Sequence, residues 1–261
     1  MANMISLLEY LQVGPPEVPV INQGQSRQNT TNQQYNHSDI SFIGFWDDFN
    51  LDTIMNQYGQ LLTEAQIEPD PMPASPPPPI TSENSLRRRC AFYLEAKVRR
   101  ALRRGFEWLE ASGELGNWSV VSFGEGDLAQ TPDNFVPDTA YFRPDLPART
   151  RQNRAPGELK PSYKWSSSLR NSDNPVHQRK FRQPLSQVNW YMGQNNAQYG
   201  FLLTNNELVA IRRIDNGMLE LSDSIPWTTS GNVTQPRLTV LLALWYLGML
   251  ASDNGPWQIQ Q

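Results

Sequence analysis

Three charged residues on two neighbouring predicted strands have the types and spacing needed for metal-assisted chemistry. Asp138 begins one strand-like segment, and Glu158 and Lys160 stand two residues apart on the next. Side chains two apart on a strand share one face. Two carboxylates so placed can share a divalent cation, which lowers the pKa of a bound water and neutralises charge on a phosphate under attack. Lys160 would add a compact positive charge beside that water.

Glu95 is a fourth candidate, on the long helix predicted before these strands. It lies three residues before Val98 and seven before Leu102, on the helix face that packs inward. A carboxylate there is paired, metal-bound or at the edge of a cleft. Two interpretations stand: Glu95 is a metal ligand, or it forms an intrahelical ion pair with Arg99, four residues on.

The elements that must position these residues alternate between helix and strand, which predicts an α/β domain. A long helix can be capped by Ser82 or Asn84 and ended by Gly113. The closing helix is apolar nearly all round, so we expect it to be buried. In chain order the predicted elements are a helix at 85–112, strands at 118–123, 135–142 and 158–165, a helix at 183–194, strands at 200–203, 208–214 and 219–221, and a helix at 236–251.

The first 80 residues differ in composition from the rest. Residues 14–38 are rich in Pro, Gln and Asn and are predicted to stay unpacked, and a proline run near residue 76 indicates a spacer. We therefore divide the chain into an acidic N-terminal region, 1–80, and a domain at 81–261. Apolar spacing at 41–66 predicts an amphipathic helix that docks on the domain or on a second copy.

Charge is distributed unevenly along the chain. Residues 1–85 carry ten acids and one base, a formal charge of −9, whereas residues 86–165 carry ten acids and fourteen bases, a charge of +4. Such asymmetry predicts a polyanion-facing domain with an acidic tail. Arginines suit phosphate contact, although a basic run is also typical of a solvated helix face. The candidate nucleic-acid-binding residues are Arg99, Arg100, Arg103, Arg104 and Lys164.

Composition excludes several classes of site and location. Cys90 is the single cysteine and there are two histidines, so neither a disulfide nor a zinc site built from imidazoles and thiolates is expected. A metal here would be bound by oxygen. The most apolar run, 238–250, is too short to span a bilayer, and no signal peptide is recognised at the start. We expect an intracellular protein, cytoplasmic or nuclear.

Longer stretches carry a family resemblance. The runs at 157–165, 187–191, 197–205 and 207–212 (GELKPSYKW, QVNWY, AQYGFLLTN and ELVAIR) resemble the PD-(D/E)XK nuclease superfamily, and more narrowly the nuclease-like domain of fungal proteins of unassigned role. The resemblance covers roughly residues 80–250. It implies a restriction-endonuclease-like core of helix, three strands, helix and strand, followed here by C-terminal strands and the buried helix.

The resemblance also implies roles for individual residues. The helix acid of the superfamily matches Glu95, with Glu83, Glu107 and Glu110 as alternatives. The Asp of its second strand matches Asp138, with Asp133 and Asp145 as competitors, and its acid-x-Lys pair matches Glu158 and Lys160. A Gln-x-x-x-Tyr motif of exonuclease-like branches matches Gln187 and Tyr191. Mg²⁺ or Mn²⁺ would bind Asp138, Glu158 and Glu95.

Three functions follow as expectations. The first is a metal-dependent nuclease, with DNA ahead of RNA as its substrate. The second is a nuclease fold that binds nucleic acid or protein without cutting. The third is an intracellular effector or toxin that its own acidic N-terminal segment regulates, through self-association or autoinhibition involving 41–66.

Overall fold

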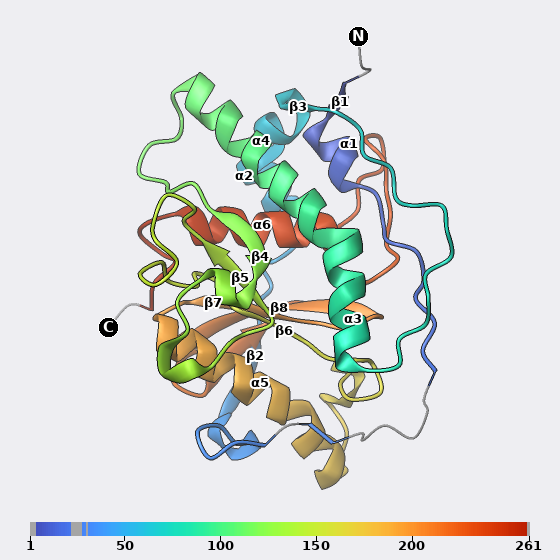
Figure 1. Cartoon of the computed structure of the whole chain (residues 1–261), viewed down its shortest axis with the longest axis vertical. Coiled ribbons are helices and arrows are strands. Elements are labelled where there is room, and N and C mark those ends of the chain that lie inside the picture. The colour runs from blue at the N-terminus through green and yellow to red at the C-terminus, as the bar shows by residue number, and fades with distance from the viewer. Residues whose placement is uncertain (1–3, 22–27, 30, 260–261) are drawn as a thin grey trace.

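The chain forms a mixed sheet between two layers of helices (Figure 1). The computed structural model describes residues 4–21, 28–29 and 31–259. Helices α4 and α6 lie on one side of the sheet and α5 on the other (Figure 1). The helices are α1 Leu7–Leu11, α2 Leu51–Glu64, α3 Glu83–Cys90, α4 Ala96–Ser112, α5 Pro175–Asn195 and α6 Val240–Ser252.

The sheet runs in the order β2-β9-β8-β7-β6-β5-β4, with β10 beside β8. Neighbours are antiparallel except at two places, where β6 is parallel to β7 and β2 is parallel to β9. The strands are β2 Phe42–Phe45, β4 Ser122–Glu125, β5 Thr139–Phe142, β6 Gly157–Leu159, β7 Tyr199–Leu203, β8 Glu207–Asp215, β9 Met218–Leu221 and β10 Ile225–Pro226. A separate pair joins β1 Ile5–Ser6 to β3 Gln66–Ile67.

The predicted long helix is present, with one irregular turn inside it. Ser82 caps its start by accepting from the Ser85 backbone N–H, and Gly113, with φ of 76°, ends it. Between α3 and α4, Ala91–Glu95 form a π-helical turn. Such a turn inserts one residue into the α-helical register and rotates the side chains that follow it. The sequence pattern did not predict this turn.

The predicted order of helix, three strands, helix and strand is observed as α4, β4, β5, β6, α5 and β7. Strands β5 and β6 are shorter than predicted, since β5 begins at Thr139 and β6 ends at Leu159, and β4 lies at Ser122–Glu125 instead of 118–123. Strand β9 pairs with β8, and the expectation of a buried closing helix is confirmed by α6. The architecture is therefore α/β with a mixed sheet.

Packing does not set residues 1–80 apart from the rest. Helix α2 buries Ile54, Leu61 and Leu62 in the core that α4 and α6 also line, so it docks on its own chain. The predicted helix at 41–66 is wrong at its start, where Phe42–Phe45 forms strand β2 of the main sheet.

The expectation of an unpacked segment at 14–38 is wrong where the structure describes it. Val18 is 3% exposed and Tyr35 is 4% exposed. Val20 forms a β-bridge with Ile80, which is itself buried beyond the proline run. Residues 22–27 and 30 of this segment lie outside the described residues. Apolar positions scattered through a polar sequence are enough to hold it against the domain.

Asn29 contacts α5 where that helix contains a proline. Pro184 has no N–H, so it cannot donate to the Lys180 carbonyl, four residues back. The Asn29 side-chain amide donates to that carbonyl at 3.1 Å and to the Lys164 carbonyl at 3.4 Å. The Asn29 side chain thus links α5 to the segment that follows β6. Helix α5 begins at Pro175, eight residues before the predicted start at 183, and continues through Pro184.

Asp70 connects the N-terminal third of the chain to α4 through ion pairs. Its carboxylate lies 2.9 Å from the Lys97 ammonium and 3.2 Å from the Arg100 guanidinium, and Tyr10 of α1 donates to it. Burial acts to raise the pKa of Asp70, but the two cations outweigh it and the net pKa is lowered from 3.8. This contact therefore contributes stability only while Asp70 is ionised.

We predict that Asp70→Asn destabilises the fold at neutral pH but not in acid. The lowered pKa means that its stabilisation is present above pH 3.8 and is lost as pH falls through the lower folded-state value. Because the side chain is partly exposed, we expect a loss of about 1 kcal/mol or less. Urea unfolding at pH 7 and near pH 3 measures it, with Asp52→Asn on the surface of α2 as the control. A difference that persists undiminished in acid would contradict the assignment.

Candidate active site

Asp138 and Glu158 come together where β5 and β6 lie side by side. Asp138 directly precedes β5, Glu158 is the middle residue of β6, and the two strands are antiparallel with Thr139 paired to Gly157. An Asp138 carboxylate oxygen accepts the Leu159 backbone N–H at 2.8 Å, and the Asp138 charge acts on Glu158. The structure therefore brings the two predicted carboxyl groups to one place.

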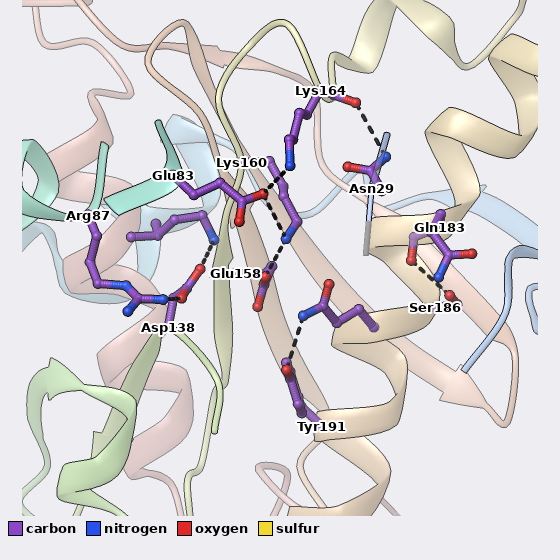
Figure 2. Close-up of polar contacts among 12 residues, drawn as sticks. Asn29, Glu83, Arg87, Asp138, Glu158, Lys160, Lys164, Gln183, Ser186 and Tyr191 are labelled. Carbon is purple, nitrogen blue, oxygen red and sulfur yellow. Dashed lines mark hydrogen bonds and ion pairs between the residues drawn. The ribbon is translucent and has the colours of Figure 1, made fainter. Parts of the chain in front are cut away.

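Glu158 and Lys160 form a buried ion pair. The Lys160 Nζ lies 2.7 Å from the Glu158 Oε1, and these side chains are 3% and 5% exposed. Lys160 also lies 3.5 Å from the Glu83 carboxylate at the start of α3. Glu83 in turn pairs with Lys164 at 3.0 Å, so both lysines meet at one α3 carboxylate (Figure 2).

Burial dominates the electrostatics of this pair. It raises the pKa of Glu158 to about 8, the Asp138 carboxylate adds to the rise, and the Lys160 ammonium opposes it. Burial alone would lower the pKa of Lys160, but Glu158 and Glu83 outweigh it and the pKa is raised. Lys160 therefore stays charged, and its ammonium group is shared between the Glu158 and Glu83 carboxylates.

Arg87 forms an ion pair with the other Asp138 oxygen (Figure 2). Its side chain is 54% exposed, whereas that of Asp138 is 9% exposed. Arg87 and Glu83 are four residues apart and so lie on one side of α3. This helix presents an acid to Lys160 and a base to Asp138.

Two contacts were absent from the predicted site, Arg87 with Asp138 and Glu83 with Lys160. Arg87 was recognised only as part of a basic run, and Glu83 only as an alternative helix acid. Their i, i+4 spacing was visible in the sequence, but nothing local specified which strand would lie beneath it.

Glu95 lies near the site without joining the ion pairs there. Its carboxylate accepts from Arg99 at 2.9 Å, as the intrahelical interpretation held. Glu95, the last residue of the π-helical turn, lines the same narrow pocket as Asp138 and Glu125. Among the described residues, no three His, Cys, Asp or Glu side chains form a group that could hold a metal ion. The role of Glu95 as a third ligand stays a prediction.

Gln187 and Tyr191 face the site from α5. The Gln187 amide donates to the Tyr191 hydroxyl at 3.0 Å, and both residues are buried. Burial raises the pKa of Tyr191, and the nearby Glu158 carboxylate adds to the rise. The same holds for Tyr35, whose pKa is raised by burial and by Glu158 while Lys160 opposes it. Tyr35, from the N-terminal segment, was missed because no motif surrounds it.

The α4 arginines lie elsewhere. Arg100 pairs with Asp70 and Arg104 with Glu107, at 3.2 Å each, and Arg103 is exposed beside β3. In the described part of the chain, no α4 arginine is ion-paired with Asp138 or Glu158. Arg100 helps to hold the N-terminal third, a role that the basic run did not reveal. Of the predicted nucleic-acid contacts, Lys164 alone joins the candidate site.

The donor set at this site fits a hard divalent cation. Asp138 and Glu158 supply carboxylate oxygens, which is the ligand chemistry that Mg²⁺ and Mn²⁺ prefer. One Asp138 oxygen accepts the Leu159 N–H, and the other is ion-paired with the exposed head group of Arg87.

Comparisons with protein-family models, curated proteins and solved structures find no match for this chain. Within the described residues, no helix has the length and apolar character needed to cross a membrane.

We predict that Glu158→Gln makes stability less dependent on pH. Because burial raises the pKa of Glu158, the folded state holds this proton more tightly than the unfolded chain. That stabilisation is present below the ordinary value of 4.5 and is lost as pH rises toward about 8. Gln cannot titrate, so the decline in unfolding free energy across this range should become shallower.

Urea unfolding from about pH 5 to pH 8 measures the effect, with Glu114→Gln, an exposed carboxylate after α4, as the control. A slope equal to that of the unchanged protein would contradict the raised pKa. Lys160→Ala is a poorer probe, because an unpaired buried carboxylate costs about 3–5 kcal/mol and threatens the fold itself.

Proposed function

We propose that this protein is a metal-dependent nuclease of the PD-(D/E)XK type, with a restriction-endonuclease-like core. The observation that carries the proposal is that Asp138, directly before β5, accepts the Leu159 N–H next to Glu158 of β6, while Lys160 contacts Glu158. Further support comes from the succession of α4, three strands, α5 and β7, with β6 and β7 parallel and the other core neighbours antiparallel.

Each residue has a separate task in this proposal. Asp138 and Glu158 hold the divalent cation, and when bound that ion supplies an activated water and neutralises charge on the phosphate. Lys160 opposes the rise in the pKa of Glu158 and would present a positive charge to the attacked group. Gln187 and Tyr191 close the α5 side of the site and orient Glu158. Lys164 extends the positive surface toward the nucleic-acid backbone.

A second candidate is a nuclease fold that binds without cutting. The observation that favours it is internal neutralisation, since Arg87 pairs with Asp138 and Lys160 pairs with Glu158. A site whose carboxylates are satisfied by its own cations can persist without a metal ion. Binding of nucleic acid or protein would then use the exposed arginines of α3.

We predict that cleavage of DNA requires Mg²⁺ or Mn²⁺ and both carboxylates. Asp138→Asn and Glu158→Gln should each lower the rate by more than about a hundredfold, because even outer-shell partners of a metal cost about 10–100-fold. Chelation should abolish cleavage and leave binding in place. Rates on labelled DNA and RNA, measured beside binding affinities, test this.

Asp145→Asn is the matched control for these variants. Asp145 is exposed, pairs with Arg143 and was a competitor for the role given to Asp138, so its loss should leave cleavage unchanged. Binding without cleavage under either metal, together with no effect of Glu158→Gln, would overturn the nuclease and leave the binding module.

A further inference from the structure

Six ionisable side chains at the candidate active site are linked by ion pairs. Three are carboxyl groups and three are cations: Glu83, Asp138, Glu158, Arg87, Lys160 and Lys164. Both oxygens of Asp138 are engaged, one by the Leu159 backbone N–H and the other by Arg87. A divalent cation that binds Asp138 must therefore compete with a resident cation for this carboxylate.

Arg87 is the resident cation that can leave. Its side chain is 54% exposed, against 3% for Lys160 and 13% for Lys164. Both lysines are also anchored by Glu83, whereas Asp138 is the sole carboxylate ion-paired with Arg87 in the described chain. The Arg87 head group can therefore swing away at little cost in desolvation.

A hollow beside the site can accommodate the displaced Arg87 head group. This hollow of about 490 Å³ is lined by Arg87 and Arg88 on the α3 side and by the carboxylates of Glu125, Asp127 and Asp138 on the other. Asp138 forms one wall, so a phosphate adjoining an ion at Asp138 would come within reach of the guanidinium. The planar fork of arginine suits two phosphate oxygens at once.

We propose that Arg87 holds the place of the divalent cation on Asp138 and transfers to a backbone phosphate of the nucleic acid when the ion binds. This inference rests on the proposed nuclease function and adds a positioning residue to it. The ion and the phosphodiester then bind cooperatively, because the ion releases Arg87 from Asp138 and the released guanidinium binds the phosphate.

The first test is Mn²⁺ binding without nucleic acid, followed by the electron paramagnetic resonance signal of the free ion. Arg87→Gln should bind Mn²⁺ about tenfold more tightly, because the ion no longer competes with a charge-assisted hydrogen bond. Arg88→Gln removes the same charge from the same hollow without touching Asp138, and should change the affinity by less than about twofold. Adding Asp138→Asn to Arg87→Gln should abolish the gain.

The second test is binding and cleavage of a DNA oligonucleotide. Arg87→Gln should bind DNA more weakly and cleave it more slowly although its Mn²⁺ site is tighter, and Arg87→Lys should lie between. A merely structural role would weaken both kinds of binding together. Unchanged Mn²⁺ affinity in Arg87→Gln, with cleavage still dependent on Asp138, overturns this inference alone. Loss of any Asp138 dependence in Mn²⁺ binding and cleavage overturns the nuclease as well.

Discussion

The Lys160 ammonium has almost no contact with water and must be neutralised where it lies. Glu158, two residues before it, supplies one carboxylate, and Glu83 supplies another from the start of α3. Once Glu83 holds α3 against the end of β6, the next turn of that helix brings Arg87 over Asp138. The positions of α3, β5 and β6 relative to one another thus follow from the need to satisfy one buried charge.

Local signals in the sequence predicted much of this arrangement. Apolar spacing and the stop at Gly113 gave the long helix, and alternating segments gave β5 to β9 in the right order. The shared face of Glu158 and Lys160 followed from their two-residue separation, and the pairing confirms it. These features depend on residues close together in the chain, whose geometry periodicity determines.

Features made by distant segments could not be read in the same way. Arg87 and Asp138 are 51 positions apart in the sequence. A run of basic residues does not indicate whether its side chains will pair with a carboxylate or face solvent. Tyr35 is close enough to Glu158 for that carboxylate to raise its pKa, although the composition of its segment predicted no packing. Arg100 was assigned to nucleic acid because its partner, Asp70, lay across the proline run. In each case the deciding term was tertiary electrostatics or burial, which local propensity does not encode.

The parallel pairing of β2 with β9 also has a consequence for biosynthesis. Phe42–Phe45 lies beside Met218–Leu221, so this edge of the sheet joins segments that leave the ribosome far apart in time. Contacts of such sequence separation form slowly because a long loop must close first. Trp46 and Phe49 are buried in the folded protein, but their partners late in the sequence have not been synthesised when they leave the ribosome. The β2 edge of the sheet can therefore close only after Met218–Leu221 has been synthesised, which leaves early apolar residues exposed until then.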